Sequence, residues 1–118
     1  MKIQMIVRFL DDAGLPFMGR GPVELLQAID RLGSINKAAK EMNMSYVKSW
    51  KIIKRIEACL GGKILKTEIG GKAHGGSELT QLAEEFLACY TGYENEVAIF
   101  AKEKFDEIKD RLETLRKE

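Results

Sequence analysis

The chain begins with a segment in which apolar and polar positions alternate. From Ile3 to Phe9 every odd-numbered residue is apolar, which is the pattern of a strand with one buried face. The residues "DDAG" at 11–14 supply a turn, and "LPFMG" at 15–19 can return as a second strand. Because Pro16 lacks an amide hydrogen, we expect that second strand to be irregular or to lie at an edge. The pattern predicts an N-terminal β-hairpin.

The following apolar positions recur with the period of a helix. Leucines and isoleucines fall on one stripe between Pro22, which suits a first helical position, and Gly33, which can end a helix. Ser34 can cap a second helix, in which four apolar residues from Ile35 to Met42 fall at i, i+3, i+4 and i+7. The small alanines of this second helix predict close packing against its neighbours.

A tight turn separates the second helix from a third. Asn43 tolerates the left-handed backbone that ends a helix, and Ser45 can accept hydrogen bonds from the first amides of the next one. The third helix is expected to span residues 46–60 and to end at Gly61 and Gly62. Two helices joined by such a short turn form a helix-turn-helix.

The remaining sequence predicts a hairpin and one long helix. The alternating "KILKTEI" and the short "SEL" can pair as strands across the glycine-rich loop 70–76. Thr80 can cap a helix that continues for about 35 residues and so measures about 50 Å, too long for one small domain to cover. We therefore predict a mainly α fold with a small β component, in which residues 1–80 form the helix-turn-helix domain and 81–118 form a long helix.

Charge is distributed unevenly along the chain, although the formal net charge is only +1. Residues 45–76 contain seven basic and two acidic side chains, for a net +5, whereas residues 77–118 contain six basic and eleven acidic ones, for a net −5. The basic middle coincides with the third helix and the hairpin. Most lysine-rich stripes are merely solvated faces, but here charge, motif and a helix that fits a DNA groove coincide, which favours DNA binding.

The third helix is expected to have one apolar and one basic face. The apolar face, directed at the first two helices, is predicted to comprise Tyr46, Trp50, Ile53, Ile56 and Leu60. Residues near a recognition helix's N-terminus reach base edges, and lysines further along hold phosphates. The predicted DNA-binding residues are Ser34, Asn36, Lys37, Ser45, Tyr46, Val47, Lys48, Ser49, Lys51, Lys54, Arg55, Lys66, Lys72 and His74.

Two of these assignments have alternatives that the sequence leaves open. Tyr46 falls near the edge of the apolar face, so it can be either a base contact or part of the core. His74, the only histidine, is either a DNA contact that gains charge below about pH 6.5 or an exposed residue with no role. Lys72 beside it adds a positive charge where the loop glycines allow backbone amides to approach a phosphate.

Between about residue 20 and residue 95 the sequence contains a set of short motifs, which are Gly33-Ser34-Ile35, Ala38-Ala39, Met44-Ser45-Tyr46, Trp50, Gly70-Gly71-Lys72, Gly75-Gly76 and Leu79-Thr80. In this combination of motifs the sequence resembles the N-terminal DNA-binding domain of ModE-type molybdate-responsive regulators, relatives of the LysR-type winged helices. The resemblance implies a winged helix-turn-helix that is dimeric through its long C-terminal helix and binds palindromic operator DNA. The oxyanion-binding domains of that family would begin where this sequence ends, at Glu118, so we do not expect these residues to bind molybdate.

The last helix presents an apolar stripe suited to pairing with another helix. Its members recur at intervals of three and four: Tyr93, Val97, Ala101, Phe105, Ile108, Leu112 and Leu115. Packing on the chain's own core would account for Leu82, Phe86 and Tyr90, but the residues from 105 onward lie beyond the reach of a domain of this size. A homodimer is the favoured interpretation.

Other classes of function are less well supported. An interaction module that pairs through its C-terminal helix with a larger regulator, with DNA binding secondary, is the main alternative. No catalytic constellation, Walker loop or metal-ligand spacing is present, so we expect neither an enzyme nor a cofactor. Cys59 and Cys89 form no paired motif, and no segment is long and apolar enough to span a membrane. We expect a cytoplasmic protein that contacts no membrane.

Overall fold

The computed structural model describes residues 1–67 and 76–117 of the chain. Its elements, in chain order, are β1 (Phe9–Leu10), β2 (Pro16–Met18), α1 (Arg20–Leu32), α2 (Ile35–Glu41), α3 (Tyr46–Leu60), β3 (Leu65–Thr67), β4 (Ser77–Leu79) and α4 (Gln81–Lys117). This confirms the predicted fold class, a mainly helical winged helix-turn-helix with small hairpins and a long C-terminal helix.

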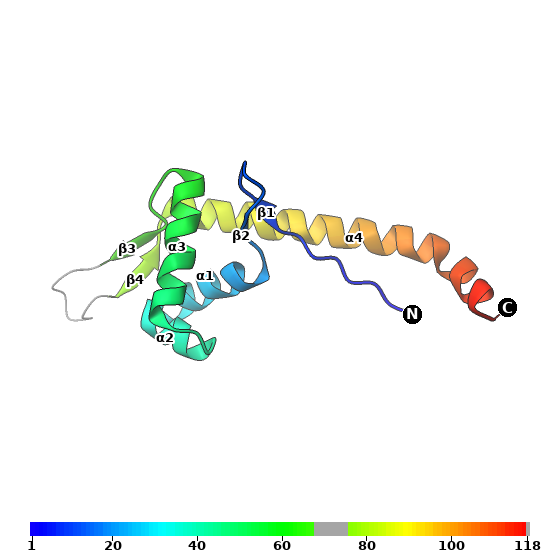
Figure 1. Cartoon of the computed structure of the whole chain (residues 1–118), viewed down its shortest axis with the longest axis horizontal. Helices are drawn as coiled ribbons and strands as arrows, with labels where there is room; N and C mark the ends of the chain where they lie inside the picture. Colours follow the sequence, from blue (N-terminus) through cyan, green and yellow to red (C-terminus); the bar gives the residue numbers. More distant parts are fainter. Residues whose placement is uncertain (68–75, 118) are drawn as a thin grey trace.

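The three shorter helices gather at one end of the molecule, and α4 extends far beyond them (Figure 1). The β3–β4 hairpin projects from the helical cluster on the side opposite to the C-terminus. The longest dimension is 68 Å and the radius of gyration is 18.5 Å, whereas a compact chain of this length would have a radius of about 13 Å. Most of α4 therefore lies outside the domain, as the length of the helical pattern predicts.

Side-chain caps begin the second and third helices at the predicted residues. The Ser34 hydroxyl oxygen accepts a hydrogen bond from the Lys37 amide at 3.2 Å, and that of Ser45 accepts one from the Lys48 amide at 3.0 Å. Each cap satisfies an amide that has no partner within its helix. The caps fix where α3 starts and therefore which residues form its first turn.

Residues in the left-handed backbone conformation end the helices where the sequence predicts. Gly33 has φ 69° after α1 and Gly61 has φ 73° after α3, while Asn43 has φ 55° in the turn between α2 and α3. A side chain with Cβ is disfavoured there, and asparagine tolerates the conformation better than most. One boundary differs slightly, because α1 begins at Arg20, two residues before Pro22. Proline is still tolerated, since amides of the first turn have no intrahelical partner.

The N-terminal strand is much shorter than the alternation predicts. The strand pair is confined to Phe9–Leu10 and Pro16–Met18, with an irregular register between Phe9 and Leu10. Residues 1–8 are not part of a strand. The strand is short because its partner is short. The returning arm ends at Gly19, directly before α1, so no extended backbone remains to pair with residues 2–7.

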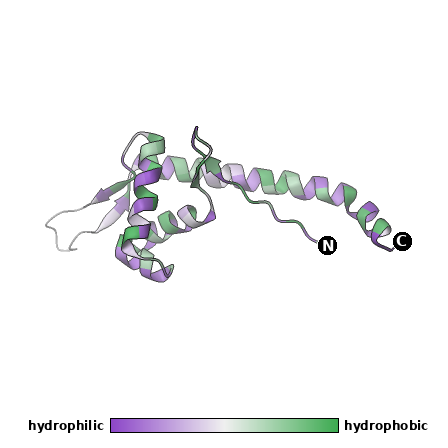
Figure 2. Ribbon diagram, in the orientation of Figure 1, coloured by the Kyte–Doolittle hydropathy of each residue, from purple (hydrophilic) through white to green (hydrophobic). Residues whose placement is uncertain are grey.

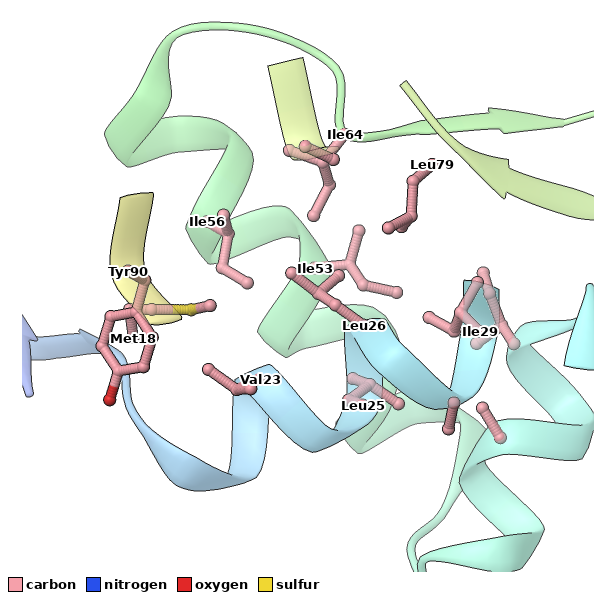
Figure 3. Packing of buried hydrophobic residues seen from close by; sticks show 14 residues of the cluster. Met18, Val23, Leu25, Leu26, Ile29, Ile53, Ile56, Ile64, Leu79 and Tyr90 are labelled. Carbon is pink, nitrogen blue, oxygen red and sulfur yellow. The ribbon is translucent and has the colours of Figure 1, made fainter. Parts of the chain in front are cut away.

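The core lies between α1, α3 and the first turns of α4. Figure 3 shows Ile53 of α3 beside Leu26 of α1, with Ile64 and Leu79 closing the side towards the β3–β4 hairpin. Leu25, Leu26 and Ile29 are completely buried, as are Ile56 and Ile64. Apolar and polar residues alternate along the whole length of α4, including the part that projects from the domain (Figure 2).

A buried tyrosine connects the N-terminal hairpin to α4. Tyr90 is fully buried, and its hydroxyl donates a hydrogen bond to the Val7 carbonyl oxygen at 2.5 Å. Phe9 packs edge-on against Tyr90 and against Phe86 and Tyr93, at centroid distances between 5.0 and 6.1 Å. These contacts fix where α4 leaves the domain.

We expect Tyr90→Phe to destabilise the fold by about 1 to 2 kcal/mol. The substitution removes the hydroxyl that donates a hydrogen bond to the Val7 carbonyl oxygen. Chemical denaturation monitored by circular dichroism measures the change. Tyr93→Phe is the matched control, since Tyr93 is half exposed; its stability should stay within about 0.5 kcal/mol of the wild type. Equal effects of the two substitutions would contradict the assignment.

Candidate nucleic-acid interface

The buried face of α3 is narrower than predicted and is centred on different residues. Its buried members are Ser49, Ile53 and Ile56. The Ser49 hydroxyl donates to the carbonyl oxygens of its own helix, at 2.8 Å to Tyr46 and 3.2 Å to Ser45, so no polar group is left unpaired. The prediction that Ser49 contacts bases is therefore wrong: a small side chain at this position lets α3 approach the core closely.

Trp50 lies on the outward side of α3, where the sequence did not place it. It is 40% exposed, and Tyr46 is 48% exposed. The prediction that both rings belong to the apolar face is wrong, because Ser49 occupies the place in the core. The open choice for Tyr46 is resolved in favour of an exposed side chain. The sequence did contain a sign of the true buried face: Ser49 is followed at helical spacings by Ile53 and Ile56.

The first turns of α3 present a continuous outward surface. Tyr46, Val47 and Lys48 are all exposed, and Lys51 follows one turn later. Within the described part of the chain, neither Lys48 nor Lys51 forms an ion pair. No carboxylate of the described residues therefore competes with an anion for either ammonium group.

Arg55 makes contacts within the protein instead of lying open on the basic face. Its Nε donates to the Pro16 carbonyl oxygen, and Nη2 reaches both the Leu15 carbonyl oxygen and the Asp11 carboxylate, all at 3.0 Å. The Leu15 amide and the Arg55 guanidinium lower the pKa of Asp11 below its ordinary value. The prediction that Arg55 holds a DNA phosphate is corrected: it anchors the N-terminal hairpin to α3.

A stack of three side chains runs along one flank of α3. The rings of Tyr46 and Trp50 are nearly parallel, with centroids 6.5 Å apart and 10° between their planes. The Lys54 Nζ lies over the Trp50 ring, 4.3 Å from its centroid. The Lys54 ammonium is in turn 3.0 Å from Glu57 Oε1. The Glu57 carboxylate therefore partly neutralises the Lys54 ammonium, which weakens the attraction of Lys54 for a phosphate.

Glu57 joins the recognition helix to the start of the wing strand. One carboxylate oxygen accepts a hydrogen bond from the Ile64 amide at 3.0 Å, and the other lies near the ammonium groups of Lys54 and Lys63, at 3.0 and 4.0 Å. Burial alone would raise the pKa of Glu57, but the Ile64 amide and the Lys54 ammonium outweigh it and lower the pKa. Its hydrogen bond to Glu57 raises the pKa of Lys54.

The other predicted contacts lie on α2 and on the hairpin. Asn36 and Lys37 are exposed in the first turn of α2, beside the half-buried Ser34. Lys66 of β3 is exposed and lies 3.7 Å from Glu78 of β4. Lys72 and His74 are outside the described residues.

Comparison with known protein families identifies the family to which the chain belongs. Residues 22–84, which extend from the third residue of α1 to the first turn of α4, match the family described as bacterial regulatory helix-turn-helix proteins of the lysR family. The chain belongs to this LysR family. It is thus a helix-turn-helix member of a DNA-binding transcription-regulator family, as the sequence resemblance indicated.

Within that family, the similar proteins are ModE-like. The molybdenum-pterin-binding protein MopB of Rhodobacter capsulatus is 40% identical over 81 residues, which are 69% of this chain and 30% of MopB. The transcriptional regulator ModE of Haemophilus influenzae is 38% identical over 68 residues, 58% of this chain and 27% of that protein. The LysR-family chain thus spans about a third of the length of these relatives.

A solved structure supports the same fold for the LysR-family domain. The DNA-binding domain in the crystal structure of the CbnR_DBD–DNA complex aligns with 78% of this chain and 95% of its own, with a TM-score of 0.52 and 22% identity. At this identity the likeness shows the winged helix-turn-helix fold alone.

The pairing between Glu57 and the wing strand gives the LysR-family domain a pH-dependent contribution to stability. The pKa of Glu57 is below its ordinary value of 4.5, so this contribution is fully present above that value and is lost as the pH falls through the lower, folded-state pKa. Glu57→Gln should therefore destabilise the protein near neutral pH. We expect the difference between variant and wild type to shrink as the pH falls below 4.5.

Denaturation midpoints measured from pH 7 to pH 3 test this expectation. Glu78→Gln is the matched control, because Glu78 is exposed and only its weak pair with Lys66 is lost. A difference between wild type and Glu57→Gln that is the same at every pH would show that the carboxylate charge is not what matters.

Proposed function

We propose that the chain is a sequence-specific DNA-binding transcription regulator that acts as a homodimer. Helix α3 enters the major groove, and the wing loop 70–76 lies along the backbone. The observation that carries the proposal is the exposed first turn of α3, which presents Tyr46, Val47 and Lys48 on a winged helix-turn-helix of the LysR family. A major groove about 12 Å wide admits one such helix. The proposed site of action is the cytoplasm.

The contacts divide into base-reading and phosphate-holding groups. We assign base-edge contacts to Lys48, because it is exposed in the first turn of α3, and a phosphate contact to Lys51, which lies further along the helix. Additional phosphate contacts are proposed for Asn36 and Lys37 at the start of α2. Lys66 and Lys72 extend the charge onto the wing.

Dimerisation is proposed through the part of α4 that projects from the domain. Three members of the predicted stripe are about half exposed: Tyr93 at 53%, Ile108 at 51% and Leu115 at 55%. The remaining four, Val97, Ala101, Phe105 and Leu112, are half-buried. Ala101 and Phe105 share a groove with Met1, Ile3 and Met5, so the N-terminal segment shields part of the stripe.

Exposed apolar residues recurring along a projecting helix favour a second copy as the partner. A two-fold dimer would address a palindromic operator with half-sites about 34 Å apart. A larger regulator in place of the second copy is the alternative function. The names of several relatives refer to molybdenum, but this chain spans only about a third of their length, and we assign no molybdate site to it.

Affinity for operator DNA should fall steeply with salt. Neutralising about eight phosphates would weaken binding on the order of a thousandfold or more between 50 and 200 mM salt. Lys48→Ala should reduce affinity and change the preferred sequence, whereas Lys117→Ala, at the far end of α4, should do neither. Fluorescence anisotropy across a salt series and selection from random duplexes measure both effects. A flat salt response would contradict the proposed DNA binding.

Ile108→Glu should convert the proposed dimer to a monomer, because it places charge in the apolar contact. Thr114→Glu is the matched control, since it adds the same charge at an exposed position outside the stripe. Sedimentation velocity distinguishes the two species. A wild-type chain that is monomeric at micromolar concentration would favour the larger-regulator alternative.

A further inference from the structure

The recognition helix carries a contiguous apolar patch on its exposed side. Tyr46, Val47 and Trp50 are 48%, 59% and 40% exposed, and they are neighbours at spacings of one, three and four residues. Residues three and four positions apart are neighbours on a helix surface, so the Trp50 side chain lies beside both Tyr46 and Val47. A single exposed apolar residue needs no explanation, but three together on the face proposed to meet DNA call for a ligand with apolar groups.

The patch is held in a fixed shape. The Trp50 ring stacks with the Tyr46 ring, with centroids 6.5 Å apart, and the Lys54 Nζ lies 4.3 Å from the Trp50 ring centroid. Lys54 is fixed by Glu57, and Glu57 by the Ile64 amide. This chain of contacts runs from the aromatic rings to the base of the wing. Little side-chain freedom is left to lose on binding, which favours discrimination between similar surfaces.

Among the four bases, only thymine presents an apolar group in the major groove, its C5 methyl; the other edges present hydrogen-bond donors and acceptors. Val47 has no group that can satisfy such donors or acceptors, and burying them unpaired is costly. We propose that Tyr46, Val47 and Trp50 form a thymine-reading surface that packs against C5 methyl groups and selects A·T pairs at the base steps they cover. This inference rests on the proposed function and extends it by assigning sequence preference to Trp50.

The experiment removes the methyl group and nothing else. Operators are first selected from a random duplex library with the wild-type protein. Each thymine of a selected half-site is then replaced singly by uracil, which pairs with adenine but lacks the methyl. We expect one or two positions at which uracil weakens binding about fourfold, the effect of losing one buried methyl contact. Thymines outside the half-sites should tolerate the replacement without change.

Protein variants then assign those positions to the patch. For each protein we compare its affinity for the thymine duplex with its affinity for the uracil duplex. In Trp50→Ala or Val47→Ala this affinity ratio should fall to about one at the matching position, whereas in Trp50→Phe it should stay between one and the wild-type value. The ratio compares two duplexes bound by the same protein, so a general loss of stability does not change it. Lys51→Ala is the matched control: it should weaken binding to both duplexes equally and leave the ratio intact.

The outcomes separate this inference from the proposed function. If operators are selected but no uracil replacement changes affinity, the thymine-reading surface is wrong while DNA binding stands. If the ratio at every sensitive position is the same in Trp50→Ala, Val47→Ala and the wild type, the methyl contact belongs to other residues and the inference is likewise overturned. If no duplex is selected above background, both the inference and the proposed function fail.

Discussion

Burial of Ser49, Ile53 and Ile56 decides what the rest of α3 can do. Only these three residues of α3 are fully buried, and the identity of the buried face sets which side chains point outward. The Ser49 hydroxyl makes this possible, because it bonds to carbonyl oxygens of its own helix and enters the core without an unpaired polar atom. Because Ser49 is fully buried, a large residue at this position would have no room in the core and would displace the first turn of α3.

The two charged residues that flank this face act as positioning devices. Arg55 ties α3 to the hairpin through two backbone carbonyl groups and Asp11, and Glu57 ties it to the wing through the Ile64 amide. Hydrogen bonds to backbone groups do not depend on which side chain the partner residue has. They therefore fix the position of α3 relative to the hairpin and the wing whatever side chains those partner residues carry. The recognition helix is thereby held from both sides, and a rigid scaffold lets side chains at its surface discriminate between ligands.

Local signals were sufficient for most of the fold. Ser34, Ser45, Gly33 and Gly61 act within a few residues of themselves, and the structure has each in its predicted capping or terminating role. The N-terminal strand depended on a distant partner, which the alternating pattern could not reveal. The candidate site was harder to predict for the same reason. From the sequence, Trp50 is expected in the core and Arg55 on the open surface, but in the fold Trp50 is exposed and Arg55 binds the N-terminal hairpin.

The separation of charge along the chain acquires a spatial meaning from the fold. The basic segment folds into α3 and the start of the wing, whereas the acidic one is mostly α4, which leads away from the helical cluster (Figure 1). A polyanion near α3 would therefore meet the positive end of the molecule first, and the acidic helix would be repelled from the same backbone. In the proposed complex, this repulsion would favour an orientation in which the long helix points away from the duplex. The distribution of charge, which is nearly invisible in a net value of +1, thus favours the same arrangement as the packing of α3.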